Sequence, residues 1–509
     1  MRFISLTRFH KPNTSQEHAS NFWRQQEGIA ALIAITALSV FSLLGLYLSL
    51  NATTEVRISE NYESHQQADL AARAGLNHAR ELIRGLQLND LLQGPKAIDD
   101  PSKYPSTRSL QYAFRNWMDW STARSLNILD PASDLTGLSS DDLGLINTGK
   151  YGGADGTPLV PRTGIALTAP DPDGSGTVTT ARYFLKVTDN PEDCDTDPFT
   201  DCDGIVIVRS TGVARTIRET GGPVRANSVA VYEAKFKELR TFDLDAPVVV
   251  EGDGVLPAAT TMFTGSSFNI DGSPNPYSIG TLYGIGTIDT NTSNTIHPAD
   301  QIKARLSPER FRNIKGKCCG PTQPAIGDIT TTVGLNPDKR LLLDPNFLGN
   351  IAYNLMPKFA DNVYQGNQSW PAGTAVDLGY YDPSEPLDAP SQRFKITYVN
   401  GDLSVSGNFS GAGVLLVTGK LSISGSLRWS GLILVIGQGY VDTTGGMAAV
   451  EGGLYVVNLQ SGNPPFGTPK ITVSGSSSFK LDDKALLMAI RSLPQVELSR
   501  REVTSLIDP

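Results

Sequence analysis

The sequence has 509 residues, which at roughly 150 residues per domain predicts about three folded units rather than one. Hydrophobic residues make up 39% and charged residues 19%, an ordinary balance for chains that bury a core, so wholesale disorder is excluded. The 43 Lys and Arg against 52 Asp and Glu give a net charge of −9, which argues against nucleic acid as a partner because no excess of cations can neutralise phosphate. The 49 Gly and 32 Pro favour turns and short strands over helical bundles.

The N-terminal part of the chain contains one long apolar run. Ile29 to Leu50 are 22 residues without a charge or a proline, which corresponds to about 33 Å of helix and is long enough to cross a bilayer. The run is longer than the ~7 to 15 apolar residues of a cleaved secretory signal. The 28 residues before it carry a net charge of +2, so we expect them to stay in the cytoplasm and the rest of the chain to be exported.

The helical pattern continues beyond the apolar run. Apolar residues recur at roughly helical spacing from Val56 to Leu86, so we expect one long helix that leaves the membrane and packs its lower half against the exported part. A membrane anchor followed by a separate helix at the membrane surface is the simpler interpretation of this pattern. The junction between the polar leader and the apolar run favours a more specific one.

At this junction the leader ends in RQQEG, so Gly28 stands directly before the first apolar residue, Ile29. The chain here resembles the type IV pilin-like class, in which a prepilin peptidase cuts after such a glycine. Residues 28–86 resemble more narrowly the N-terminal domain of PilX-like pilus assembly proteins. The resemblance implies processing at Gly28 and Ile29, with 1–28 as the leader and 29–50 as the helix that moves from the membrane into the filament core.

The resemblance also implies partners and a location. Ile33 stands at the fifth mature position, where pilins usually carry Glu, and GspK-like tip subunits of type II secretion also lack this Glu. We therefore expect a minor pilin or pseudopilin that acts structurally in filament priming or at the tip. Its implied partners are the prepilin peptidase, other minor pilins, the major pilin and a tip adhesin. It would be anchored in the inner membrane with an exported ectodomain before it enters a pilus or pseudopilus.

For the exported part we predict an α+β fold. Segments such as ARYFLKVTD and SVAVYEAKFKEL alternate apolar and polar residues in part, as in a sheet with one packed face. Together with the resemblance, this pattern predicts a stalk helix and a pilin-like antiparallel sheet over 51–240. Residues 241–397 are richer in Gly, Pro, Asn and Thr and are expected to form an intermediate domain.

The region 398–480 contains a weak repeat with a period of 18 residues, which aligns Gly413 with Gly431. Short strands at fixed spacing bury their faces by stacking, so we expect a small β-solenoid, with a β-sandwich as the alternative. Residues 481–509 are expected to hold a helix from Asp483 to Leu493 and a tail. This helix is expected to cap an open end of the solenoid.

Two groups of residues suggest binding or redox chemistry. The first is an acidic loop of five carboxylates that could wrap calcium between two cysteines that we expect to form a disulfide: Asp193, Cys194, Asp195, Asp197, Asp201, Cys202 and Asp203. Because Pro198 stands where an EF-hand loop needs Gly, a solvated acidic loop closed by the disulfide is the competing interpretation. The second group is the adjacent pair Cys318 and Cys319, which could form a strained bridge, pair elsewhere or stay free.

The sequence contains few residues that could support catalysis. Outside the stalk the only exported histidine is His297, which we expect to be a surface residue, and neither a CxxC pair nor a phosphate-binding loop occurs. We therefore expect no enzyme. The alternative from the binding class is an uncleaved, membrane-anchored surface protein whose solenoid recognises polysaccharide. The alternative from the enzyme class is a β-helix polysaccharide lyase or hydrolase that uses exposed carboxylates.

Overall fold

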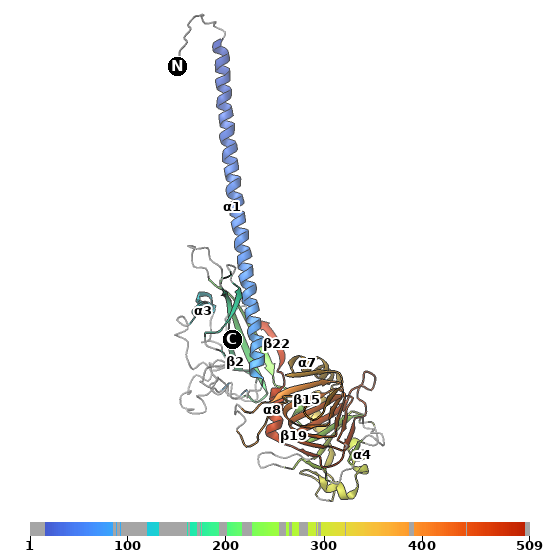
Figure 1. The fold of residues 1–509 in the computed structure, drawn as a ribbon. Helices are drawn as coiled ribbons and strands as arrows, with labels where there is room; N and C mark the ends of the chain where they lie inside the picture. The colour runs from blue at the N-terminus through green and yellow to red at the C-terminus, as the bar shows by residue number, and fades with distance from the viewer. Residues whose placement is uncertain are drawn as a thin grey trace, which may run out of the picture.

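The computed structural model describes residues 16–84, 88, 92, 120–131, 160, 163–170, 174, 176–192, 201–215, 226–253, 261–263, 267–273, 283–291, 293, 297–320, 322–385, 391–443 and 445–503. Helix α1 (Gln16–Ile83) is one continuous helix that rises from a body of mixed α and β structure, and its N-terminal end lies far from that body (Figure 1). The expected single long helix is thereby confirmed. The body contains both antiparallel and parallel sheets.

The first sheet is antiparallel, and the lower part of α1 lies on one of its faces. Its strands follow the order β1 (Ile165–Pro170), β2 (Thr177–Asp189), β3 (Ile205–Ala214), β4 (Ser228–Lys237) and β22 (Val496–Glu502). A short helix, α3 (Trp120–Ser125), contacts β4. Helix α1 and the sheet share one apolar core, which includes Leu76, Phe184 and Phe236.

Small residues let α1 approach this sheet very closely. A Cβ atom added to Gly212 of β3 would lie 2.1 Å from the carbonyl oxygen of Ala68 and 2.5 Å from the backbone nitrogen of Ala72. A Cβ atom on Gly75 of α1 would lie 2.1 Å from the Oγ of Ser210. Since real Cβ atoms do not approach other atoms so closely, a side chain at Gly212 would push the backbone of α1 away from β3, and a side chain at Gly75 would displace that of Ser210.

The strand at the edge of this sheet comes from the end of the chain. Glu233 of β4 accepts hydrogen bonds from Arg209 of β3 at 2.7 Å on one carboxylate oxygen and from Arg501 of β22 at 2.7 Å on the other. The side chains of Arg209 and Glu233 are only 6% and 5% exposed, whereas that of Arg501 is 73% exposed. Residues 238–495 are therefore an insertion between two neighbouring strands that this carboxylate joins.

The insertion contains two parallel sheets. The larger one contains β5 (Val248–Gly252), β7 (Asn269–Asp271), β8 (Ile285–Asp289), β9 (Ile314–Lys315), β10 (Ile326–Asp328), β11 (Asn362–Gln365), β13 (Lys395–Asn400), β15 (Asn408–Val417), β17 (Ser426–Gly437), β19 (Met447–Asn458) and β21 (Ser478–Lys480). The smaller one contains β6 (Thr261–Phe263), β12 (Gln368–Trp370), β14 (Leu403–Val405), β16 (Lys420–Ile423), β18 (Tyr440–Asp442) and β20 (Lys470–Val473). From β11 to β20, successive strands alternate between the two sheets, so each circuit of the chain adds one strand to each.

The register of these strands confirms the 18-residue period. Gly413 of β15 is paired with Gly431 of β17, and Lys395 of β13 is paired with Gly413. The next circuit is longer, because Gly431 pairs with Gly452 of β19. Strands from earlier in the chain continue the same stack: β5 pairs with β19, β6 with β20 and β7 with β21. Residue 397, where the sequence suggested a boundary, lies within β13.

The remaining helices cover the outer face of the larger sheet or lie beside it: α4 (Pro298–Arg305), η4 (Pro308–Asn313), α5 (Thr330–Leu335), η5 (Lys339–Leu343), α6 (Pro345–Asn350), η6 (Ile351–Leu355), α7 (Met356–Phe359) and α8 (Asp483–Ser492), with η3 (Arg240–Phe242) in the connection from the first sheet. The expected helix near Asp483 is confirmed as α8, but it does not cap an end of the stack.

Helix α8 packs on the face of β15, β17 and β19. The reason is that these strands carry apolar side chains on both faces, so Leu432 and Leu434 need a cover that Leu486 and Ile490 supply.

Glycines stack at one register position of β15, β17 and β19. Gly413, Gly431 and Gly452 have φ values of +113°, +126° and +134°. A Cβ atom on Gly431 would lie 2.4 Å from the carbonyl oxygen of Gly413. Each circuit therefore approaches the next through backbone alone at this position, and a side chain would separate them.

We predict that Gly431→Ala lowers the free energy of unfolding by about 2–3 kcal/mol or more, because the new Cβ meets a carbonyl and the backbone angle is strained. Gly462→Ala is the matched control, since no atom lies within 4 Å of its added Cβ. Thermal and denaturant unfolding of the detergent-solubilised chain measures both. Equal stability of the two variants would contradict this account of the stack.

We also predict that Glu233→Ala costs about 3–5 kcal/mol, because it removes the carboxylate from the buried guanidinium of Arg209. Arg501→Ala should cost less than about 1 kcal/mol, because an exposed ion pair contributes little. The same unfolding measurements compare the two. A larger loss in Arg501→Ala than in Glu233→Ala would show that β22, rather than the buried pair, dominates this contact.

Candidate functional site

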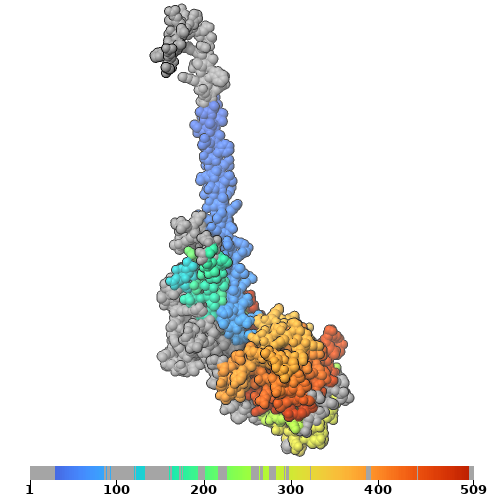
Figure 2. Space-filling view, in the orientation of Figure 1, coloured from blue at the N-terminus to red at the C-terminus, as the bar shows by residue number. Residues whose placement is uncertain are grey.

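The N-terminal half of α1 exposes apolar side chains on every side. We call residues 29–50 the apolar rod. Its large hydrophobic side chains are between 50% and 72% exposed: Ile29, Leu32, Ile33, Ile35, Leu38, Val40, Phe41, Leu43, Leu44, Leu46, Tyr47, Leu48 and Leu50. Figure 2 shows this part of α1 as a bare column above the body. The helix is long and apolar enough to cross a membrane, which supports membrane anchoring.

Hydroxyl groups in and next to the apolar rod donate hydrogen bonds to carbonyl oxygens of the same helix. Thr36 donates to the carbonyl oxygen of Leu32 at 2.9 Å, and Ser39 donates to that of Thr36 at 2.8 Å. Thr53 likewise donates to the carbonyl oxygen of Ser49 at 2.7 Å. These hydroxyls therefore need no water, so they can enter lipid or a dry helix bundle at little cost.

The expected processing site lies inside α1. Gly28 belongs to the helix, and Ile29 is the first residue whose side-chain exposure is described. Ile33 offers an exposed apolar side chain. The rod can therefore contact neighbours through apolar surface.

The acidic loop is described only in part. Asp193, Cys194, Asp195 and Asp197 lie outside the described residues. Asp201 accepts hydrogen bonds from the backbone N–H groups of Gly204 and Ile205 at 2.8 and 3.0 Å, and Arg240 contacts its other oxygen at 3.2 Å. Burial raises the pKa of Asp201 to about 6. The oxygens of Asp201 thus hold the start of β3, and calcium binding by this loop stays a prediction.

Further loop residues have defined contacts. Asp203 accepts from the N–H of Ile205 at 2.8 Å, and Cys202 is disulfide-bonded. Cys318 and Cys319 are joined to each other by a disulfide, and Cys319 has a φ of +79°. In the part of the chain that the structure describes, no three His, Cys, Asp or Glu side chains are placed to hold a metal.

His297 has a carboxylate partner. Its Nδ1 lies 2.6 Å from Oδ2 of the buried Asp289 at the end of β8, and this hydrogen bond raises the pKa of the imidazole. The other oxygen of Asp289 accepts from the N–H of Asn291 at 2.9 Å. The pair connects the end of β8 to the first turn of α4, which begins at Pro298. The expectation of a partly exposed histidine at the surface agrees with its 42% exposed side chain.

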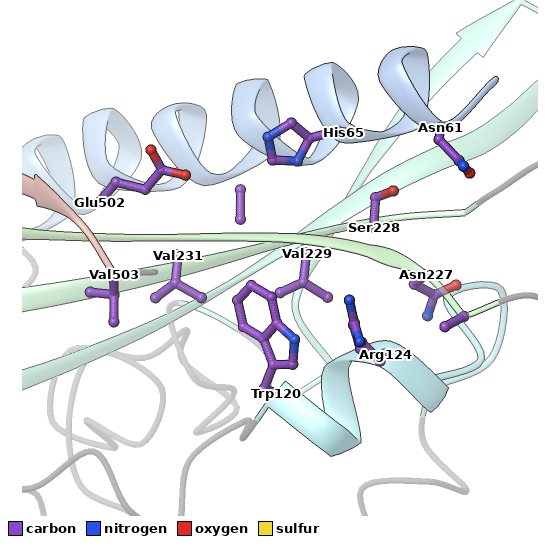
Figure 3. A pocket seen from close by; sticks show the side chains of 12 residues that line it. Asn61, His65, Trp120, Arg124, Asn227, Ser228, Val229, Val231, Glu502 and Val503 are labelled. Carbon is purple, nitrogen blue, oxygen red and sulfur yellow. The ribbon is translucent and has the colours of Figure 1, made fainter. Parts of the chain in front are cut away.

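A pocket of about 480 Å³ lies where the lower half of α1, α3, β4 and β22 meet (Figure 3). Its lining is Asn61, His65, Trp120, Arg124, Ala226, Asn227, Ser228, Val229, Ala230, Val231, Glu502 and Val503. In Figure 3 the polar side chains of His65 and Ser228 lie on the side of α1, whereas Val229 and Val231 face Trp120. Sequence reasoning missed this pocket, because its walls come from four segments far apart in the chain.

The lower end of α1 is tied to the inserted body. Arg84 donates to the carbonyl oxygen of Phe359 at 2.7 Å and pairs with Asp361 at 3.3 Å. Arg80 donates to the carbonyl oxygen of Gln495 at 3.0 Å. The same helix that carries the apolar rod therefore contacts both the first sheet and the inserted body.

A fully buried carboxyl group lies between β5 and β19. Glu251 accepts a hydrogen bond from the hydroxyl of Tyr455, and its Oε1 has no hydrogen-bond partner among the described residues. Burial raises the pKa of Glu251 from 4.5 to about 8. The folded chain thus keeps a proton that the unfolded chain loses. The resulting stabilisation is complete below about pH 4.5 and is lost as the pH rises towards 8.

We predict that the melting temperature of the wild-type chain falls between pH 5 and pH 8 and that Glu251→Gln falls less, because the amide carries no titrating proton. Asp201 contributes in the same direction, so the difference between the two proteins isolates Glu251. Glu192→Gln, at an exposed position, is the control. Circular dichroism melts of the solubilised chain measure the slopes, and identical slopes would contradict the role of Glu251.

Comparison with known proteins identifies no similar protein that could indicate the function. No family model, no curated protein and no solved structure matches this chain. The function proposed below therefore rests on the residues and geometry of the chain itself.

Proposed function

We propose that this chain is a PilX-like minor pilin or pseudopilin of a type IV pilus-like filament, with a structural rather than a catalytic role. It is inserted as a prepilin, cut after Gly28 and assembled through the apolar rod. One observation carries the proposal: a single helix has one half that is apolar on every side and another half that packs on an antiparallel sheet.

The rod cannot stay in water. Fully burying one large apolar side chain is worth about 1.5–3 kcal/mol, so the rod as a whole gains tens of kcal/mol when lipid or other helices cover it. Lipid and a helix bundle cover the apolar side chains of the rod with about the same gain in free energy, because lipid tails are as apolar as the side chains of a helix bundle. Removal of the leader with its charged side chains helps the helix exchange one for the other, since only the new N-terminal ammonium then remains at the cytoplasmic face.

The shape of the chain favours a position at or near the filament tip. The inserted body is much wider than the rod and lies at the opposite end of α1 (Figure 2). Such a body at every position would prevent close packing of neighbouring rods, so low copy number, priming or tip display fits better. Other minor pilins, the major pilin, the prepilin peptidase and a tip adhesin are the partners of such a subunit, and a GspK-like role in type II secretion fits the same features.

We further propose that the paired parallel sheets of the inserted body form a β-solenoid. Its smaller sheet suggests the second candidate function, an uncleaved, membrane-anchored surface protein that binds polysaccharide. Ser404, Ser422 and Asp442 occupy successive register positions of this sheet. Beside them, Lys420 and Lys470 lie 4.3 and 4.4 Å from the ring centroid of Tyr440. A flat polar face of this kind suits hydroxyl-rich ligands, and tip adhesion would combine both functions.

The mature N-terminus distinguishes the two functions. We predict that mass spectrometry of native, membrane-extracted protein finds Ile29 as the first residue and that the processed form cofractionates with a filament. Gly28→Arg should keep the leader, because a large charged residue replaces the small one before the cut, and should lose cofractionation. Gln25→Ala, within the leader, is the control and should be processed normally. Native protein that begins at Met1 and never cofractionates with an appendage would contradict pilin function and favour the surface anchor.

A further inference from the structure

The pocket between α1 and α3 contains a strand edge that no strand of the described residues covers. β22 pairs with β4 only as far as Glu502 and Tyr232, and the N–H of Val503 then donates to the carbonyl oxygen of Val231 at 2.8 Å. On its other side β4 stays paired with β3 as far as Ser228. The first three residues of β4, Ser228 to Ala230, therefore have a strand on one side and the pocket on the other.

The backbone of this edge is ready to accept a strand. Successive residues of a strand direct their N–H and C=O groups to alternate sides, so Val229 directs its groups to the same side as Val231, into the pocket. Val229 is buried, and no described residue bonds to its backbone on that side. An unpaired peptide group in such a place is costly unless a further chain or water satisfies it.

The walls of the pocket are fixed. Ser64 of α1 is hydrogen-bonded to Ser228 at 2.7 Å, which sets the distance between α1 and β4. Asn227 donates through its side chain to the carbonyl oxygens of Ala123 and Leu126 at 3.0 and 2.7 Å, and its backbone N–H donates to that of Arg124 at 2.9 Å. These bonds hold α3 beside the strand edge. A chain that enters the pocket therefore meets a preformed slot and loses less free energy to ordering.

We propose that this slot receives an extended segment of a second pilin-like subunit, which adds a strand to β4 in line with β22. The three residues of open edge span about 10 Å, which suits a short segment of about three residues. The walls select its side chains: one face of the added strand meets Trp120 and Val229, and the other meets His65 and Ser228 (Figure 3). The segment is therefore one that alternates apolar and polar residues.

Position along α1 argues for a neighbouring subunit as the source of this strand. Asn61 follows Leu50, the end of the apolar rod, by 11 residues, which is about 16 Å along the helix. A chain whose own apolar helix lies level with the rod leaves the apolar layer at this height and passes beside the slot. The inference rests on the proposed function, because it is that function which brings a second rod into place.

Photo-crosslinking of the full-length chain in its own membrane, with the other filament subunits present, tests the proposal. The crosslinking amino acid benzoylphenylalanine replaces Asn61 at the slot, Tyr62 as the matched control outside it, or Leu38 in the rod. At Asn61 we expect a product whose crosslinked peptide, identified by mass spectrometry, is an extended segment of a pilin-like subunit. The Tyr62 product should be roughly tenfold weaker, since only a paired strand comes close to the slot lining.

Two variants establish that pairing causes the product. Val229→Pro removes the N–H that a strand needs, and His65→Trp fills the slot from the exposed face of α1. Each should reduce the Asn61 product roughly tenfold without changing the Leu38 product. Val229→Ala keeps the N–H and should retain the Asn61 product.

The outcomes distinguish a failure of the strand proposal from a failure of the proposed pilin function. An Asn61 product with residues 504–509 of the same chain, with lipid or with a glycan would overturn the strand proposal, and so would a product that both blocking variants leave unchanged. In those cases a Leu38 product with sister subunits still supports the pilin function. Absence of the Leu38 product in the unmodified chain would instead count against the pilin function itself.

Discussion

The close contact between α1 and β3 is the constraint on which the architecture depends. At Gly212 the backbone of β3 lies directly against the backbone of α1, and at Gly75 the backbone of α1 lies against the side chain of Ser210. A helix held this firmly can extend far beyond its support and still keep a fixed direction relative to the sheet. The proposed filament subunit needs this rigidity, because a rod that pivoted at the sheet could not enter an ordered bundle with the body held clear of it.

The inserted body depends on the same contact through its attachment points. The chain leaves the first sheet at the end of β4 and returns to it at the start of β22. Glu233 of β4 joins the two strands through Arg501 of β22 and also pairs with Arg209 of the neighbouring β3. Arg84 adds a direct bond from α1 to the body. The body is therefore held by two chain connections and by the helix, which is more restraint than a single linker gives.

Sequence patterns predicted the parts of this fold whose signal is local. The long helix, the antiparallel strands and the register of Gly413 with Gly431 follow from periodicity. The pairing of β5 with β19 could not be predicted, because it joins residues about two hundred positions apart without any repeat between them. The same holds for the slot, where His65, Trp120 and Val229 converge only after folding. The position of α8 was wrong in the sequence analysis because alternation alone does not reveal strands that are apolar on both faces.

The direction of β4 has a mechanical consequence. α1 and β4 run side by side, since Ser64 meets Ser228 near one end, while Arg80 reaches Gln495, next to the start of β22, near the other. Tension applied between the apolar rod and the inserted body therefore acts along the strands and loads their hydrogen bonds together, in shear. Bonds loaded together resist a pull far better than bonds peeled apart one by one, so this domain can transmit a pull between the inserted body and the apolar rod.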